Sequence, residues 1–244
     1  MSENEKVNSP VETDNSNSVL EARRNFLKLG GLGIAALAVG SIAKTDVFAN
    51  PVSRQTTQTV NLGTGDVAIL NFAYLLEQLE AQFYAQVVAN SYYAGATAEE
   101  RQILGDLRDH ESIHRQFFKA AITAAAPSQV IPDLTFNFSL VDFGSRDSVL
   151  TISQILEDTG VSAYNGAGQI IQNADYLVLA GKIVSVEARH AAAIRDLRIP
   201  RNGFFADSGT DFAQDPRTVL NLAAPFFPAG LRVVADGIPR TIVV

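Results

Sequence analysis

The sequence predicts an all-α protein, a four-helix bundle with a long crossover between its second and third helices and an irregular C-terminal tail. Four long segments repeat apolar residues at the spacing of one helix face. Short links join the first segment to the second and the third to the fourth, whereas residues 127–145 separate the middle pair. Short links predict antiparallel hairpins, and the long connection can run the length of a bundle. The two hairpins are an internal repeat, because Glu77 with Tyr84 seven residues later recurs as Glu157 with Tyr164.

Start and stop signals give approximate limits for each helix. Asp66 is expected to cap the first helix, and Thr97 with Glu100 forms the capping-box signature of the second. Pro127 follows the second helix and Pro200 follows the fourth, at positions where proline ends a helix. The four helices are expected over residues 66–90, 97–125, 147–173 and 174–197.

The bundle is expected over residues 66–198, with a different composition on either side. Residues 50–65 are rich in Thr, Gln and Gly and are interpreted as a linker. Residues 199–244 contain Gly, Pro and Phe clusters, a short capped helix near Asp215 and a strand-like stretch at the end. We expect this C-terminal extension to pack on the bundle.

Composition excludes several classes of function. The chain has 244 residues, of which 47% are apolar, so it can bury one sizeable core. A net charge of -7 and the lack of a Lys/Arg cluster argue against a nucleic-acid partner. There is no cysteine, which excludes disulfides, zinc–thiolate sites and iron–sulfur clusters. A metal in this protein must use oxygen and imidazole ligands.

Two Glu-x-x-His pairs are the features most relevant to chemistry. They are Glu111 with His114 and Glu187 with His190. Residues three apart share a helix face, so each pair points with its leucine and isoleucine neighbours toward the core. A carboxylate is costly in a core unless a positive group meets it there.

The first and third helices each add an acid on the same stripe, Glu77 and Glu157. Glu80 falls opposite Gly160 in the repeat, which favours Glu77 as the inward acid, and Glu80 is kept as an additional candidate. Four carboxylates and two imidazoles form the ligand set of a binuclear carboxylate site, and two divalent cations would balance the charge. Such ligands suit iron or manganese, with zinc as an alternative.

Three further side chains lie near the expected site. Tyr84 and Tyr164 are interpreted either as amphipathic core residues or as hydrogen-bond donors to ligand carboxylates. His110 lies one turn before His114 and is expected at the rim rather than as a ligand, since Val186 holds the matching place in the fourth helix. It remains an additional candidate beside Glu80.

Residues 1–49 are expected to be a signal peptide. Arg23 and Arg24, followed by Asn-Phe-Leu-Lys, resemble a bacterial twin-arginine (Tat) signal, whose machinery exports folded proteins. The next apolar run has 15 residues, whereas a membrane-spanning helix needs about 20. Cleavage is expected near Ala49, with Ala43 as the competing site, which predicts a periplasmic or envelope protein. A retained N-terminal anchor is the alternative.

Residues 66–198 resemble the ferritin-like superfamily, and the segments 70–84 and 156–164 are similar to its desiccation-related branch. The resemblance implies a four-helix bundle with a di-iron or di-manganese centre. The residues at the matching positions are Glu77, Glu111, His114, Glu157, Glu187 and His190.

The expected function is that of an exported protein whose two iron or manganese ions react with oxygen or peroxide, either oxidising ferrous iron or removing oxidants. If it is an enzyme, it is a di-metal oxidoreductase. One alternative is a non-catalytic envelope or desiccation and stress-protection protein that uses the bundle as a structural module. Another is a manganese-catalase-like activity. No sequence feature indicates a cage-forming interface, and the oligomeric state is left open.

Overall fold

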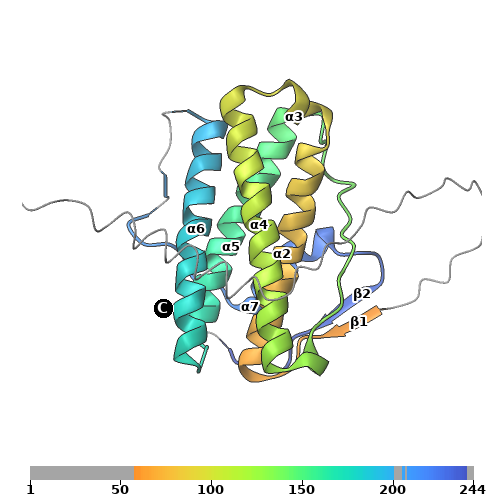
Figure 1. Ribbon diagram of the computed structural model, residues 1–244, viewed down its shortest axis with the longest axis vertical. Helices are drawn as coiled ribbons and strands as arrows, with labels where there is room; N and C mark the ends of the chain where they lie inside the picture. The colour runs from red at the N-terminus through yellow and green to blue at the C-terminus, as the bar shows by residue number, and fades with distance from the viewer. Residues whose placement is uncertain (1–57, 201–204, 207, 241–244) are drawn as a thin grey trace, which may run out of the picture. The chain divides into compact units, whose positions relative to one another are not determined.

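Four long helices pack as two antiparallel hairpins, α2 (Gly65–Val88) with α4 (Ala98–Ala125) and α5 (Arg146–Gly168) with α6 (Ala174–Arg198) (Figure 1). The predicted all-α bundle with its long crossover is confirmed. The computed structural model describes residues 58–200, 205–206 and 208–240, so the expected signal peptide with Arg23 and Arg24 lies outside the described residues.

Most of the predicted helix ends are confirmed, and two are wrong. The Thr97 hydroxyl accepts from the Glu100 amide and the Glu100 side chain accepts from the Thr97 amide, as a capping box requires. Asp66 does not cap its own helix, because its carboxylate accepts instead from the backbone amides of residues 172 and 173. Helix α5 ends at Gly168 rather than at Asn173, since Asn173 caps α6. A short helix that the sequence pattern did not predict, α3 (Ser91–Gly95), joins α2 to α4.

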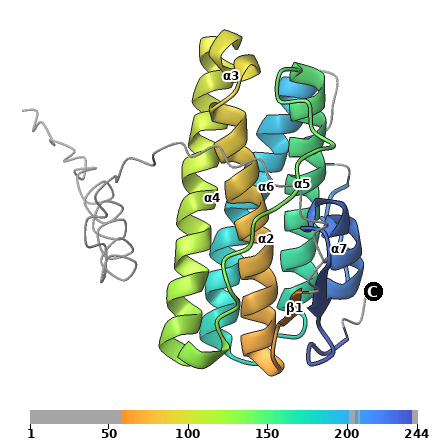
Figure 2. The ribbon, with the colours of Figure 1, turned by 90° about the vertical axis from the view of Figure 1, so that its right-hand side faces the viewer.

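The crossover runs along α2 for most of its length (Figure 2). Side-chain amides of α2 form hydrogen bonds with the backbone of the crossover. Gln78 accepts from the Leu134 amide at 2.7 Å, and Gln82 donates to the Leu134 carbonyl at 2.6 Å. Asn71 likewise donates to the Gln129 carbonyl at 2.8 Å and is fully buried. The crossover begins with a short 3-10 turn, η1 (Pro127–Gln129). The middle of α2, residues 68–81, is therefore buried on every side and can carry acids away from solvent.

Part of the C-terminal extension contacts α5, where the Gln214 amide donates to the Ser162 carbonyl at 3.0 Å. Helix α7 (Pro216–Ala223) begins at the predicted cap, where the Asp215 carboxylate accepts from the Arg217 amide, and η2 (Ala224–Phe226) follows it. The strand β2 (Leu231–Val234) then pairs in parallel with β1 (Gln58–Asn61). Part of the expected linker is thus a strand, because its backbone groups pair with those of β2.

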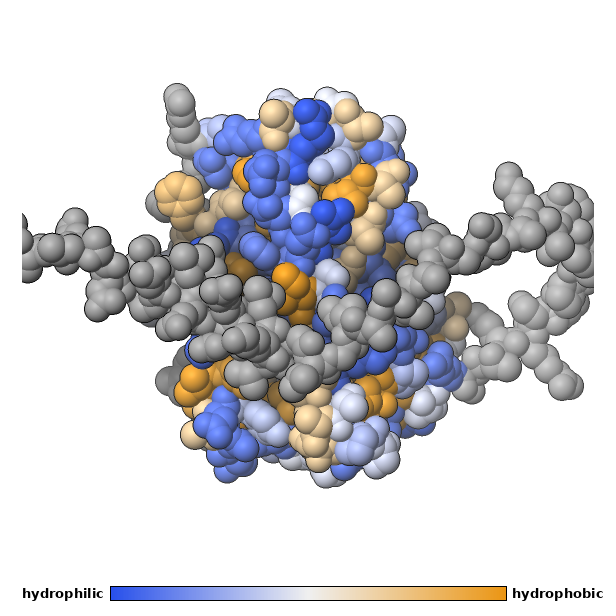
Figure 3. All heavy atoms as spheres, viewed as in Figure 1, coloured by the Kyte–Doolittle hydropathy of each residue, from blue (hydrophilic) through white to orange (hydrophobic). Residues whose placement is uncertain are grey.

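The surface is mostly polar on the face seen in Figure 1, where hydrophobic residues are scattered among hydrophilic ones (Figure 3). Within the described residues, no helix is long and apolar enough to cross a membrane.

Gly166 allows the extension to approach α5 closely. A Cβ at this position would lie 1.8 Å from the Gln214 carbonyl oxygen, and the Gln214 amide donates to the Ser162 carbonyl at 3.0 Å. We expect Gly166→Ala to lower the free energy of unfolding by about 1–3 kcal/mol, measured by urea denaturation, because the backbone must shift. Gly181→Ala in α6 is the control, since among the described residues a Cβ there would meet no atom within 4 Å beyond its own stretch of helix. An equal effect of both substitutions would contradict the prediction.

Candidate metal centre

Six buried side chains, four glutamates and two histidines, meet inside the bundle and come from all four long helices. The least exposed, Glu111 and Glu157, have 0% exposure, and the most exposed, His114, has 7%. Helical spacing puts each Glu-x-x-His pair on one inward face. The six are Glu77 on α2, Glu111 and His114 on α4, Glu157 on α5, and Glu187 and His190 on α6.

The six side chains form two overlapping groups. In each group, one ligand atom from every member lies within 4.8 Å of the others. Glu111 and Glu187 belong to both groups, as expected for carboxylates that two ions would share. The first group is Glu77, Glu111, His114 and Glu187, and the second is Glu111, Glu157, Glu187 and His190.

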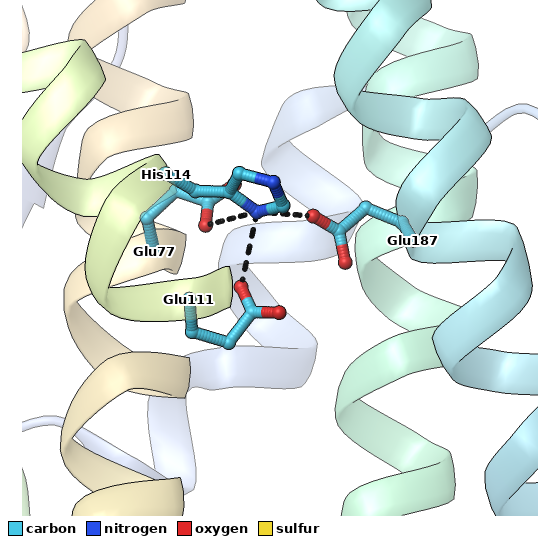
Figure 4. Close-up of side chains that lie close together, drawn as sticks. All are labelled: Glu77, Glu111, His114 and Glu187. Carbon is cyan, nitrogen blue, oxygen red and sulfur yellow. Dashed lines mark ion pairs between the residues drawn. The ribbon is translucent and has the colours of Figure 1, made fainter. Parts of the chain in front are cut away.

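The first group converges on Nδ1 of His114 (Figure 4). This nitrogen lies 2.8 Å from Glu187 Oε1, 3.4 Å from Glu111 Oε2 and 3.5 Å from Glu77 Oε2. These short distances lack hydrogen-bond geometry, because neither His114 Nδ1 nor Glu187 Oε1 has a hydrogen-bond partner in the described part of the chain. Three carboxylate oxygens thus crowd one imidazole nitrogen, an arrangement that could hold a metal ion.

The second group surrounds Nδ1 of His190, which, unlike Nδ1 of His114, makes a hydrogen bond within the described residues, to Glu187 Oε2. This nitrogen lies 2.9 Å from Glu111 Oε1, 3.1 Å from Glu187 Oε2 and 3.4 Å from Glu157 Oε2. Both oxygens of Glu111 and Oε2 of Glu157 are buried without a hydrogen-bond partner among the described residues. Buried polar atoms in proteins are normally paired, so these unpaired oxygens fit a site completed by cations. Oxygen and imidazole donors without sulfur suit iron, manganese or zinc.

In the metal-free protein, protons on the two histidines and on Glu111 offset much of the negative charge of the four carboxylates. Burial would lower the pKa of His190, but Glu111, Glu157 and Glu187 outweigh it and raise the pKa to about 12. Burial likewise works against the charged form of His114, and its carboxylate neighbours raise its pKa. Burial and then Glu187 raise the pKa of Glu111 to about 8. These protons therefore neutralise charge that bound cations would neutralise in a metal-loaded site.

Glu80 is a fifth buried acid beside the two groups and belongs to neither. Burial, followed by the carboxylates of the site, raises its pKa well above the usual range. A Cβ on residue 160 would lie 3.3 Å from Glu80 Oε1, so Gly160 leaves space for this side chain. The departure from the repeat thus has a steric reason: glycine in α5 accommodates the extra acid of α2.

The two tyrosines join opposite hairpins. The Tyr84 hydroxyl donates to Glu157 Oε1 at 2.5 Å, and the Tyr164 hydroxyl donates to Glu77 Oε1. Burial, then the neighbouring carboxylate, raises the pKa of each phenol, so both remain donors at neutral pH. Each tyrosine therefore holds a carboxylate of the other hairpin, which confirms their interpretation as donors to carboxylates of the expected site.

His110 is exposed, as expected for a rim residue, but it also contacts a buried member of the site. Its Nδ1 lies 2.9 Å from Nε2 of His190. Sequence reasoning missed this contact. The available signal was the asymmetry of the repeat, which has a histidine before Glu111 and Val186 before Glu187.

Removing one tyrosine hydroxyl should weaken metal binding without unfolding the chain. We expect Tyr84→Phe and Tyr164→Phe each to reduce affinity for Mn²⁺ about 10–100-fold, because a ligand carboxylate loses its donor. Isothermal titration calorimetry measures the effect. Tyr74→Phe is the control, since the Tyr74 hydroxyl donates to Asp133, outside the two groups. Unchanged affinity in both site variants would show that the tyrosines are only core residues.

A four-helix bundle with four inward carboxylates and two Glu-x-x-His histidines defines a class of carboxylate-rich metal-binding bundles. The chain belongs to the ferritin-like family: the model of the ferritin-like domain matches residues 65–199, which span α2 to α6. No curated protein matches the chain. The predicted superfamily is therefore confirmed, whereas the desiccation-related branch stays a prediction.

Proposed function

We propose that this protein holds two iron ions, or alternatively two manganese ions, and reacts with oxygen or peroxide. The supporting observation is the pair of overlapping ligand groups with unpaired buried oxygens. Glu77, Glu111, His114 and Glu187 would hold one ion, and Glu157 and His190 would complete the other site with the shared glutamates. When bound, two redox-active ions supply electrons to a small oxidant, and ferrous iron is oxidised as peroxide is reduced to water.

A small apolar pocket adjoins Tyr164, whose hydroxyl donates to Glu77, and its size favours a small reactant. This pocket of about 20 Å³ lies between the hairpins and is lined by apolar side chains, including Ala73, Phe118 and Ala180, with Tyr164 beside them. This volume is close to that of a single water-sized molecule. Tyr164 and Tyr84 fix the outer carboxylates in place. Oxygen and peroxide match this space better than an organic substrate does.

The experiment starts with metal content. The chain expressed with its N-terminal segment intact should contain about two iron or manganese ions per chain. The iron-loaded protein should then oxidise ferrous iron with peroxide or oxygen, followed by absorbance, whereas oxygen evolution from peroxide by the manganese form would indicate catalase-like chemistry. Metal-free protein that binds neither ion would contradict the proposal and favour a structural, stress-protective module.

We propose in addition that the Tat machinery exports the folded chain to the periplasm or cell envelope, with cleavage near Ala49. The support is the twin arginine followed by an apolar run. Replacing Arg23 and Arg24 together by Lys should retain the uncut chain in the cytoplasm, as shown by cell fractionation. Arg54→Lys, in the expected linker, is the charge-matched control. Equal export of both variants would contradict the proposal.

A further inference from the structure

The two ligand groups differ in the hydrogen-bond partner of the histidine nitrogen that faces away from the carboxylates. Both histidines turn Nδ1 toward the carboxylates, which leaves Nε2 facing outward. Behind His190, Nε2 lies 2.9 Å from Nδ1 of His110. In the part of the chain that the structure describes, no such bond is made by Nε2 of His114, and Val186 holds the position that matches His110.

The two imidazole rings meet in the geometry of a hydrogen bond. Their planes differ by only 13° and their centroids are 5.1 Å apart. The joined nitrogens are 2.9 Å apart, so the centroid separation is about that distance plus the radius of each ring. The rings therefore meet edge to edge and nearly in one plane, which directs an N–H of one ring at the lone pair of the other.

The roles of donor and acceptor follow from the surroundings of His190. To act as a ligand, its Nδ1 must be free of a proton, so the proton of the neutral ring sits on Nε2. This N–H then points at Nδ1 of His110, which must accept it, and the second nitrogen of His110 donates toward solvent from an exposed side chain. A partner on the outer nitrogen fixes the tautomer and orientation of a metal-ligating histidine.

We infer that His110 is a positioning residue that accepts the Nε2–H of His190 and so makes the site formed with Glu157 and His190 the tighter of two unequal metal sites. The inference rests on the proposed metal centre. His110 is not itself a ligand here, because neither of the two ligand groups contains it. It acts through His190 alone, which predicts an effect on one ion and not on the other.

Zinc titration of three variants tests the affinity. We expect His110→Ala to weaken the tighter of the two Zn²⁺ binding steps about 10–100-fold in calorimetry and to leave the weaker step unchanged. His110→Asn should restore most of the affinity, since its side-chain oxygen can accept at the place of Nδ1. Val186→Ala, at the matching position of the repeat, should leave both steps as in the native chain.

A nuclear magnetic resonance experiment tests the hydrogen bond directly. The chain has three histidines, so ¹⁵N-histidine labelling of the Zn²⁺-loaded protein gives a spectrum that can be assigned by single substitutions. We expect a coupling across the N–H···N bond between His190 and His110, and a slowly exchanging Nε2–H that persists in His110→Asn but not in His110→Ala. A merely structural role for His110 would give no coupling and no rescue.

The outcomes separate this inference from the proposed function. A native chain that binds no Zn²⁺, Mn²⁺ or Fe²⁺ would overturn both. A native chain that binds two ions, with equal affinities in native protein and His110→Ala, would overturn only the positioning role. Loss of both binding steps in His110→Ala, with native circular dichroism, would also overturn it, because the inference predicts an effect on one site.

Discussion

Glu111→Ala is expected to abolish binding of both metal ions, whereas Glu77→Ala and Glu157→Ala should each abolish only one. Glu111 belongs to both ligand groups, but Glu77 and Glu157 each belong to one. Elemental analysis of the purified variants gives the count of bound ions, and calorimetry with Mn²⁺ gives the affinities. We expect at least a hundredfold loss in each affected site, since removing a ligand exceeds the roughly 10–100-fold cost of losing its hydrogen-bond partner.

Folding can be separated from metal loss in this experiment. Glu187 lies within 2.8 Å of His114 Nδ1 and 3.1 Å of His190 Nδ1, so both histidines keep a carboxylate partner when Glu111 is removed, and the metal-free variant should remain folded. Circular dichroism checks this expectation. Glu99→Ala is the matched control, because Glu99 lies on the same helix and is exposed. Loss of a single ion in Glu111→Ala would show that this carboxylate is not shared.

The sequence was sufficient to predict the parts of the site that repeat. Glu111 with His114, and Glu187 with His190, stand at helical spacing on apolar stripes, which determines both the helix face and its burial. Duplication favoured Glu77, which has a counterpart in Glu157, and Glu77 is the one that belongs to a ligand group. Glu80 is buried as well, so the repeat did not identify every inward acid of α2. Periodicity and repetition are local properties, and so they can be read without the fold.

Long-range contacts could not be predicted in this way. Asp66 has the position and chemistry of a cap, but its carboxylate reaches the amides of residues 172 and 173, which only the folded hairpins bring near. The pairing of β1 with β2 joins segments at opposite ends of the described chain. The bond from His110 to His190 likewise depends on how α4 and α6 face each other. Local pattern carries no information about these partners.

The crossed tyrosines show why such contacts matter for the site. Tyr84 on α2 holds Glu157 on α5, while Tyr164 on α5 holds Glu77 on α2. Each hairpin therefore positions a carboxylate of the other, so the two halves of the repeat cannot form complete ligand groups independently. Glu111 and Glu187, which both groups share, add a second dependence. The centre is a property of the assembled bundle.

Metal affinity should rise steeply with pH, because the metal-free site holds protons that the ions must displace. His190 has a pKa of about 12 and His114 also has a raised pKa, so both are imidazolium ions at neutral pH and each must lose a proton to bind a metal. Glu111, with a pKa of about 8, releases a third proton below that pH. Displacing three protons makes the overall constant for two ions rise roughly a thousandfold per pH unit.

The slope should change at the pKa of Glu111. Below a pH of about 8, three protons leave as the two ions bind, whereas above it Glu111 is already ionised and two leave, so the increase falls to roughly a hundredfold per pH unit. Both histidines stay protonated in the metal-free form across this interval, which keeps the slope from falling further. Calorimetry in two buffers of different ionisation enthalpy counts the released protons at each pH. Binding that releases no protons near neutral pH would contradict the prediction. It would mean that the carboxylates do not keep these histidines protonated in the metal-free chain.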